Sequence, residues 1–465
     1  MRVLLVQPTT PPRAIAGDDW FVFEPLALEY LAAGLAQDAE VRILDQRLDG
    51  DLRPALEAFE PDVVGITAYT VHVNTVRSLF DTVKRWNPNV LTVVGGHHAT
   101  VAPQDFRSPS IDLTVVGEGV HPLRQIVRSL KSGAPFAGIP GVVTAGDDPF
   151  VPLDQAVADD LDALPEPARH LTAAHRSQYF CDWMRPLASI RTSKGCPYRC
   201  KFCALWKLTC GKYLKRSPER VVRELAGIAE ENVFFADDES LIDSRRMMTL
   251  ARLIGEAGIR KRYFLYGRSD TIARHPELLE AWRKIGLTRV FVGLEFFRDE
   301  DLAYVDKRST ISDNEKAVAI LRDLDIDIYA SLMLRPEFDR RDFRALRRYC
   351  RSLGLDYPSF AVLTPLPGTD LYEEVKDDLI THDYDYVDFI HTLLPTRTTL
   401  KEFYKHYAWL INTALTPRQK MSFIVKFPLK ELGPILSRSV RIQRRVRNAW
   451  KDYEAPRRNP TRRLP

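Results

Sequence analysis

The chain has 465 residues, 45% of them hydrophobic and 28% charged, with a mean hydropathy of −0.23. This length has room for about three domains of ordinary size. No apolar run approaches the roughly 18 residues that span a bilayer, and no signal peptide is recognisable at Met1. Six cysteines in so long a chain do not form a secreted disulfide framework, so we expect a reducing, cytoplasmic location.

Positive charge is concentrated towards the C-terminal end. The net charge of the whole chain is +4, but residues 416–465 contain fourteen Lys and Arg residues against three acidic residues. Such a segment is either a solvated basic extension or a surface that meets an anionic partner. The composition favours neither interpretation.

Residues 1–135 alternate short apolar runs with amphipathic helical patterns. This alternation predicts an α/β domain with a doubly wound, Rossmann-like parallel sheet, whose ligands bind at the carboxyl ends of the strands. Strands are predicted over 3–8, 41–45, 63–67, 91–96 and 113–119, and helices over 25–36 and 73–86. Candidate binding residues at these strand ends are Tyr69, Gly95, Gly96, Gly117, Glu118 and Gly119. Glycines there are either ordinary tight turns or places where a large ligand approaches the backbone.

A proline- and acid-rich linker is predicted over 136–185, before a second series of strands in residues 186–370. Six βα repeats predict a partial, open (β/α)6 barrel with its chemistry at the carboxyl ends of the strands. Residues 371–465 are predicted to form a helical, basic C-terminal region. The barrel strands are expected over 187–193, 232–238, 262–270, 289–295, 327–334 and 359–365.

Three of the six cysteines stand close together directly after the first predicted barrel strand. Cys196, Cys200 and Cys203 have the spacing C-x3-C-x2-C. A structural zinc site, with Cys181 or Cys210 as the fourth ligand, is one interpretation. Three thiolates without a second pair are more typical of an iron–sulfur cluster, which leaves one iron open to another molecule. Cys350 is most simply a buried helix residue.

This cysteine motif, with Phe202 before its last cysteine, resembles that of the radical S-adenosylmethionine enzymes. The resemblance implies a [4Fe-4S] cluster on the three cysteines, whose open iron chelates S-adenosylmethionine. It also implies cofactor contacts at later strand ends, for which the candidates are Asp237, Asp238, Arg268, Asp270, Glu295 and Ser331. The two aspartates stand where the family often has a Gly-Gly-Glu-like motif. The structural alternative is an ion pair between Arg268 and Glu295 inside the barrel mouth.

The doubly wound domain ahead of such a barrel resembles the cobalamin-binding class of the same family. Many cobalamin domains carry D-x-H-x-x-G after the first strand, whereas this chain has QPTTPPRAIAGDD (7–19) and no histidine there. Either cobalamin binds without a histidine on cobalt, or the domain has lost the cofactor. We expect the first, with His97 and His98 lining the nucleotide tail. The stretches at 195–206 and 364–374 resemble the hopanoid C-3 methylase type within this class.

The resemblance implies a cobalamin-dependent radical methyltransferase that acts on an unactivated carbon of a lipophilic or natural-product substrate, with a hopanoid-like substrate favoured. A deoxyadenosyl radical would remove hydrogen, and the substrate radical would take a methyl group from methylcobalamin. The alternative is oxidative cyclisation or ring rearrangement without net methyl transfer. A carrier or sensor of cobalamin would not need the three cysteines. An electron donor such as flavodoxin or ferredoxin is expected, and no side chain is expected to act as a general base.

The basic C-terminal region suggests where such an enzyme works. An amphipathic stretch at 421–436 precedes Arg441, Arg444, Arg445 and Arg447. Apolar anchoring next to basic residues predicts reversible peripheral contact with the inner face of the membrane. Nucleic acid is not an expected partner, because the region has few aromatic residues for stacking.

Overall fold

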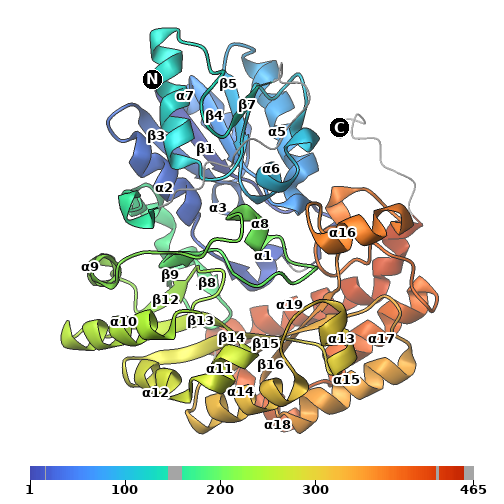
Figure 1. Ribbon diagram of the computed structural model, residues 1–465. Helices are drawn as coiled ribbons and strands as arrows, with labels where there is room; N and C mark the ends of the chain where they lie inside the picture. The colour runs from blue at the N-terminus through green and yellow to red at the C-terminus, as the bar shows by residue number, and fades with distance from the viewer. Residues whose placement is uncertain (16, 145–159, 426–428, 455–465) are drawn as a thin grey trace.

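Two six-stranded sheets, each built from one predicted βα series, form the framework of the chain (Figure 1). The computed structural model describes residues 1–15, 17–144, 160–425 and 429–454. The first sheet lies in the upper part of Figure 1 and the second in the lower part, with helix α8 (Leu205–Leu208) between them. The α/β fold class predicted from the sequence is confirmed.

The first sheet has the strand order of a doubly wound domain. Its strands are parallel except at one edge, where β7 runs antiparallel to β6. The last strand lies beyond residue 135, so the sheet continues into the stretch predicted as a linker. In spatial order the strands are β3 (Glu40–Asp45), β1 (Arg2–Gln7), β4 (Val63–Thr67), β5 (Leu91–Gly95), β6 (Leu113–Val115) and β7 (Val142–Thr144).

Helices cover both faces of this sheet because its strands are apolar on both sides. Leu4 and Val6 of β1 pack on one face, whereas Val3 and Leu5 pack on the other. The chain leaves β1 for β3 on one side and then for β4 on the other. The point where the order reverses, between the ends of β1 and β4, is the usual ligand crevice of such sheets. Helices α4 (Leu52–Phe59) and α5 (Val73–Trp86) lie on the first face, and α2 (Leu26–Leu35) and α7 (Val120–Ser132) on the second.

The second sheet is the predicted open barrel. Its six strands are all parallel and stand in chain order. Within the described ranges the two outer strands do not pair with each other, so the barrel is open. The strands are β9 (Leu187–Ile190), β12 (Asn232–Phe235), β13 (Arg262–Arg268), β14 (Leu287–Glu295), β15 (Asp327–Leu334) and β16 (Tyr357–Val362).

Amphipathic helices cover the outer face of this barrel. Val290 and Val292 of β14 pack there in one core with Trp282 and Leu321 of the helices. Cys350 is buried in the last of these helices, as predicted. The helices are α9 (Pro218–Gly227), α10 (Ser244–Glu256), α11 (Ser269–Arg274), α12 (Pro276–Lys284), α13 (Asp299–Tyr304), α14 (Ile311–Asp323) and α15 (Arg340–Ser352).

Short strands and helices lie outside the two sheets. β2 follows the first short helix and pairs antiparallel with β8, and β10 pairs with β11. Their bounds and those of the short helices are α1 (Gly17–Trp20), β2 (Phe21–Val22), α3 (Gln46–Asp49), α6 (His97–Val101), β8 (Phe180–Cys181), β10 (Ser193–Lys194) and β11 (Leu214–Lys215).

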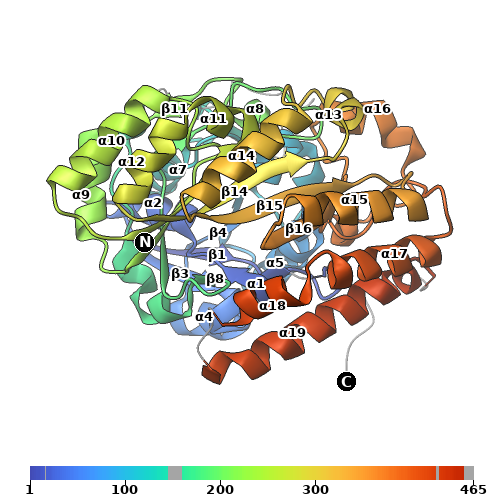
Figure 2. The same cartoon turned by 90° about the horizontal axis from the view of Figure 1, so that it is seen from below.

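The C-terminal helices belong to the folded body. Ile442, Val446 and Ala449 are buried in the core of the barrel's helical layer, so the alternative of a solvated extension is wrong for this part of the chain. Figure 2 shows α17 and α19 side by side, beyond α15. The helices are α16 (Asp370–Val375), α17 (Leu400–Thr413), α18 (Pro417–Ile424) and α19 (Leu429–Asn448), and residues 455–465 lie outside the described part.

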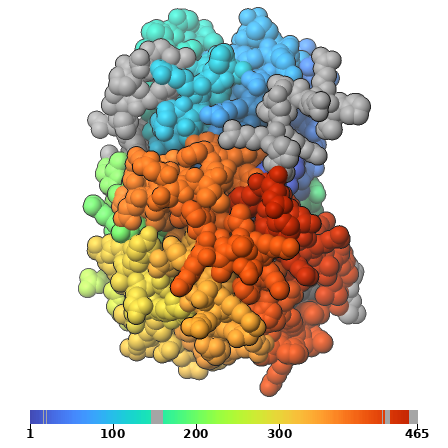
Figure 3. All heavy atoms as spheres, turned by 90° about the vertical axis from the view of Figure 1, so that its right-hand side faces the viewer, coloured from blue at the N-terminus to red at the C-terminus, as the bar shows by residue number. Residues whose placement is uncertain are grey.

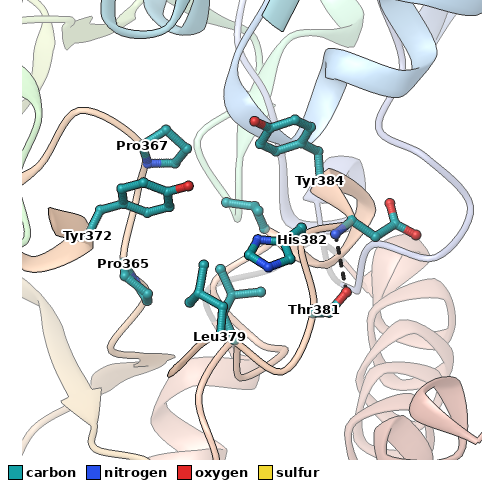
Figure 4. A pocket seen from close by; sticks show the side chains of 10 residues that line it. Pro365, Pro367, Tyr372, Leu379, Thr381, His382 and Tyr384 are labelled. Carbon is teal, nitrogen blue, oxygen red and sulfur yellow. Dashed lines mark hydrogen bonds between the residues drawn. The ribbon is translucent and has the colours of Figure 1, made fainter. Parts of the chain in front are cut away.

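The segment around α16 lies against the first domain, where the orange surface meets the blue surface in Figure 3. The Tyr384 hydroxyl donates to Asp105 at 2.5 Å, and Asn74 Nδ2 donates to Asp383 at 2.8 Å. These bonds hold the barrel's C-terminal segment to the first domain. A pocket at this seam is lined by Pro365, Pro367, Tyr372, Leu379, Thr381, His382 and Tyr384 (Figure 4).

Candidate functional site

The three cysteines lie on one loop at the carboxyl end of β9. Cys200 is buried, and Cys196 and Cys203 are partly buried. Burial raises the pKa of Cys196 to about 11 and that of Cys203 to about 12. Thiols with such raised pKa values are mostly protonated near neutral pH, and a bound iron cluster would favour their thiolate forms.

Gly195 allows the loop to pass close to its neighbours. Its φ of +89° belongs to the left-handed region, and a Cβ here would stand 2.1 Å from the Lys212 carbonyl oxygen and 2.5 Å from Thr209 Oγ1. Only glycine meets both conditions without moving the backbone. The packing of the loop therefore requires glycine at position 195, directly before the first cysteine.

Asp237 and Asp238, after β12, brace the cysteine loop. Asp237 accepts hydrogen bonds from Thr192 N at 2.6 Å, Thr192 Oγ1 at 2.7 Å and Ser193 N at 2.8 Å. Asp238 accepts one from Gly195 N at 2.6 Å. The Asp237 carboxylate is thus engaged by the chain itself, whereas Asp238 has one carboxylate oxygen outside this bond.

Glu239 follows these aspartates and was not among the residues expected from the sequence. Its Oε1 accepts a hydrogen bond from Arg268 N at 3.1 Å, and within the described residues its buried Oε2 has no partner. Burial raises its pKa to about 7. A buried carboxylate with an open oxygen suits a cationic group such as an ammonium. A Gly-Gly-Glu-like motif has its glutamate at the third position. The sequence Asp-Asp-Glu has Glu239 at that position and could have indicated it.

Arg268 and Asp270 stand together at the end of β13. Arg268 Nε donates to Asp270 Oδ1 at 2.9 Å, and Arg268 Nη1 lies 3.8 Å from Cys200 Sγ. The guanidinium also lies over the Tyr198 ring, 3.6 Å from its centre. A buried cation is therefore in contact with the cysteine loop, where the charge of a thiolate cluster would lie.

The suggested alternative, an Arg268–Glu295 ion pair, is wrong. Glu295 Oε1 instead pairs with Lys307 Nζ at 2.6 Å. Gly293 makes room for this pair, because a Cβ there would stand 2.5 Å from Glu295 Oε1. Ser331 lies within β15, in register with Gly293, and so does not follow the strand as expected.

The two candidate fourth ligands of a structural zinc site, Cys181 and Cys210, have different surroundings. Cys181 is buried beside Leu187 near the start of β9, and Cys210 is exposed. Cys181 therefore lies at the opposite end of β9 from the cysteine loop and does not join it as a fourth ligand.

The predicted residues of the first domain gather at the carboxyl edge of its sheet. Tyr69 is half-exposed there, and Gly96 follows β5 with a φ of +101°. A Cβ on Gly96 would stand 2.7 Å from Thr67 Oγ1 and 2.9 Å from Ala68 N. Gly95 ends β5, and Gly117, Glu118 and Gly119 lie between β6 and α7.

The two neighbouring histidines have different environments. His97 is exposed and its ring packs against Tyr69 with 4.7 Å between ring centres. His98 is buried, with Nδ1 3.1 Å from Thr70 Oγ1 and Nε2 2.9 Å from Asp105 Oδ2. The expectation that both line a bound nucleotide tail is therefore wrong for His98, whose polar atoms are used inside the domain.

The cysteine loop and the first sheet's edge face each other directly. Lys194 Nζ, two residues before Cys196, pairs with Glu118 Oε2 at 3.0 Å. Arg191, at the end of β9, lies 5.9 Å from the Tyr30 ring centre of α2. The candidate residues of both domains thus border one shared region.

The loop after β1, which lacks a histidine, is held by the C-terminal segment. Ile15 N donates to Asp388 Oδ2 at 2.7 Å, and Arg13 contacts the Tyr386 hydroxyl. Arg445 Nη2 donates to the carbonyl oxygens of Pro12 and Arg13 at 2.9 and 3.0 Å. The C-terminal segment thereby shapes one side of the ligand crevice.

Comparisons with known families agree with this division. Residues 13–127 match the B12 binding domain and residues 190–350 match the Radical SAM superfamily. The chain is 33% identical to the hopanoid C-3 methylase of Methylococcus capsulatus, over 82% of this chain and 74% of that one. It is 26% identical to the anaerobic magnesium-protoporphyrin IX monomethyl ester cyclase of Rubrivivax gelatinosus, over 85% of this chain and 73% of that one.

Solved structures share the fold. The radical S-adenosylmethionine methyltransferase TsrM of Kitasatospora setae, with cobalamin and a [4Fe-4S] cluster, is 24% identical with a TM-score of 0.64, over 81% and 74% of the two chains. The cobalamin-dependent radical enzyme OxsB, with aqua-cobalamin and S-adenosylmethionine, is 16% identical with a TM-score of 0.70, over 97% and 78%. Taken with the sequence matches, the chain belongs to the cobalamin-dependent radical S-adenosylmethionine methyltransferase family, with a [4Fe-4S] cluster, S-adenosylmethionine and cobalamin as its cofactors.

Proposed function

We propose that this enzyme adds a methyl group to an unactivated carbon of a lipophilic substrate, with a hopanoid-like skeleton favoured. The observation that carries the proposal is the juxtaposition of the two sites, where Lys194 of the cysteine loop pairs with Glu118 of the first sheet's edge at 3.0 Å. When bound, the cluster and S-adenosylmethionine supply a hydrogen-abstracting radical, and cobalamin supplies the methyl group. A substrate carbon held between the two strand edges would be close to both the radical and the methyl donor.

In this proposal the residues of the barrel mouth bind and orient the cluster and S-adenosylmethionine. Cys196, Cys200 and Cys203 hold the cluster, and the open Oε2 of Glu239 receives the amino group of S-adenosylmethionine. Asp237 keeps the cysteine loop in place through its three hydrogen bonds. Arg268 balances the charge of the thiolates beside it.

The remaining candidates are proposed to contact the two cofactors. Asp238, Asp270, Glu295 and Ser331 border S-adenosylmethionine, at the carboxyl ends or on the inner face of the barrel strands. Tyr69, Gly95, Gly96, Gly117, Glu118 and Gly119 border cobalamin, without a histidine on cobalt.

Two relatives support different outcomes for the substrate radical. The hopanoid C-3 methylase, at 33% identity, supports methyl transfer to a polycyclic lipid. The cyclase of Rubrivivax gelatinosus, at 26% identity, supports the second candidate, ring formation without net methylation.

Isotope labelling separates the two candidates. The reconstituted enzyme, given flavodoxin or ferredoxin as electron donor, is incubated with methyl-deuterated S-adenosylmethionine and a hopanoid lipid. Methyl transfer predicts the deuterated methyl group in the lipid product by mass spectrometry, together with 5′-deoxyadenosine. Deoxyadenosine with an oxidised or cyclised product that lacks the label would overturn the proposal.

We also propose that the enzyme docks reversibly on an anionic membrane surface through α18 and α19. Met421, Val425, Leu436 and Val440 are each more than half exposed, and Leu436 and Val440 share one face of α19. Arg441, Arg444 and Arg447 are exposed further along that helix, whereas Arg445 bonds to the loop after β1. No helix of the described residues is long and apolar enough to cross a membrane.

Flotation with liposomes tests this surface. The full-length enzyme should float with anionic liposomes at low salt and less at high salt. Replacing Leu436 and Val440 with Ser should reduce flotation severalfold, whereas Ile380→Ser, at an exposed apolar residue between α16 and α17, should not. Absence of the enzyme from the floating fraction at low salt would contradict membrane docking.

A further inference from the structure

The inner face of the barrel carries a belt of aromatic side chains below the cysteine loop. Side chains alternate along β14, so that Val290 and Val292 pack outward while Arg289 and Phe291 project inward. Phe291 is in register with Tyr266 of β13 and with Tyr329 of β15. The aromatic belt consists of Phe23, Trp183, Phe234, Tyr266, Phe291 and Tyr329.

Five of the six rings of the belt, from Phe23 to Tyr329, touch one another in sequence. Ring centres are 4.7 Å apart for Phe23 and Phe234, 5.2 Å for Phe234 and Tyr266, 4.8 Å for Tyr266 and Phe291, and 5.4 Å for Phe291 and Tyr329. Tyr266, Phe291 and Tyr329 nevertheless remain partly accessible to solvent. Partly accessible rings on three neighbouring strands favour a wide, rigid, apolar ligand.

The floor of the barrel, at the amino end of the same face, is formed by Arg289, Asp182 and Trp183. Arg289 is fully buried and pairs with Asp182 at 2.9 Å, with its guanidinium 5.7 Å from the Trp183 ring centre. Within the described residues, two buried donors near this pair, Arg289 Nε and Trp183 Nε1, have no hydrogen-bond partner. Buried donors are nearly always satisfied in folded proteins, so these two donors of the floor are suited to an acceptor that a ligand supplies.

The floor and the mouth are separated along the strand. Arg289 precedes Gly293 by four residues, and Gly293 is in register with Arg268 at the mouth. At about 3.3 Å per residue the two levels are about 13 Å apart. A rigid ligand that reaches the floor with one end therefore presents its other end to the cysteine loop.

We infer that the aromatic belt and its floor bind a rigid polycyclic lipid that carries a hydroxyl group at the end remote from the reacting carbon. The hydroxyl oxygen accepts from Trp183 Nε1 or Arg289 Nε, and the fused rings lie across the belt. Because Asp182 already neutralises Arg289, the floor does not favour a carboxylate, and this selects against a tetrapyrrole bound by its acidic side chains. The assignment of the reacting end rests on the proposed function.

Binding measurements on the reconstituted holoenzyme test this inference. Equilibrium gel filtration in mild detergent would compare a tritiated pentacyclic triterpene alcohol, the same triterpene without its hydroxyl, and a dicarboxylic porphyrin. The alcohol should bind about tenfold more tightly than the hydrocarbon, as one recovered hydrogen bond implies. Trp183→Phe should lower the affinity for the alcohol more than that for the hydrocarbon, because only the alcohol loses a hydrogen bond, and an equal change for both would contradict the assignment of the hydroxyl.

Phe291→Ala should weaken both triterpenes about tenfold or more, because it opens the centre of the belt. Phe297→Ala removes a partly buried ring after the same strand, outside the belt, and serves as the matched control. Iron and cobalamin contents verify that each variant is folded and loaded.

Equal binding of alcohol and hydrocarbon, or preference for the porphyrin, overturns the inference even if labelled methyl is transferred to another substrate. Binding of the alcohol without any methyl transfer would instead refute the proposed function alone.

Discussion

The two facing strand edges are built in opposite ways. At the barrel mouth, charged side chains are already bonded, Arg268 to Asp270 and Glu295 to Lys307. At the edge of the first sheet, glycine backbone and two exposed rings, Tyr69 and His97, meet the same region. The mouth therefore suits a small cofactor held in one orientation, whereas the glycine edge leaves room for a large one.

The largest expected effect comes from removing the three cysteines, which should abolish cluster binding at the barrel mouth and leave cobalamin binding at the first sheet. Replacing Cys196, Cys200 and Cys203 with Ala should abolish iron binding and cleavage of S-adenosylmethionine, because no thiolate remains to hold the cluster. Cobalamin retention should persist, since the first sheet has its own cores on both faces. Iron content, deoxyadenosine formation and the cobalamin spectrum are the readouts, and Cys210→Ala is the control. Cleavage by the triple variant would contradict the cluster assignment.

Gly195→Ala should disturb the barrel mouth almost as strongly. The new Cβ would collide with the Lys212 carbonyl oxygen, which is backbone and cannot rotate away. We expect iron content to fall severalfold in anaerobically purified protein. Gly211→Ala is the matched control, because its φ is also positive, +75°, but no atom lies within 4 Å of the new Cβ. Equal iron loss in both variants would show that backbone strain, and not the collision, governs the loop.

Gly96→Ala should act on the other edge. Its Cβ would press on Thr67 and Ala68, at a φ of +101° that costs an alanine about 1–3 kcal/mol. Cobalamin retention should fall while iron content stays normal, as measured by absorbance and iron analysis. Gly133→Ala, also at positive φ but in open space, should leave both unchanged. Loss of iron from the Gly96 variant would show that the two edges do not bind their cofactors independently.

A smaller, pH-dependent effect is expected where the C-terminal segment holds the loop after β1. Burial alone would lower the pKa of His391, but hydrogen bonds to Asp388 and Asp452 raise it to about 9. The stabilisation is therefore complete below the ordinary pKa of 6.5 and is lost as the pH rises through 9. Denaturant unfolding should show a decrease of at most ~3 kcal/mol across this window. His391→Gln should flatten this dependence of the unfolding free energy on pH. A variant with the same pH dependence as the unchanged enzyme would contradict the role given to His391.

The strands and long helices were predictable because their apolar periods are regular. The helix at 73–86 and the strand at 327–334 match the structure residue by residue. β7 was missed because it is a three-residue edge strand placed beyond a glycine-rich turn. Short edge strands contain too few alternating residues for a periodic pattern to be recognised in the sequence.

The site was predictable where chemistry follows spacing, as for the three cysteines. It was less predictable where a partner comes from a distant loop. Lys307, twelve residues beyond Glu295, takes the place that the suggested alternative gave to Arg268. His98 differs from His97 because Asp105 and Thr70 draw it into the core. Such long-range partners leave no trace in local periodicity.

Electron paramagnetic resonance tests most directly whether the two edges face each other across one substrate region. The holoenzyme would be prepared with cob(II)alamin, and its signal measured with the cluster oxidised and then reduced. If the two edges share one substrate region, reduction of the cluster should broaden or split the cobalt signal and speed its relaxation, because two nearby spins couple. A cobalt signal that is identical in both states would contradict the account.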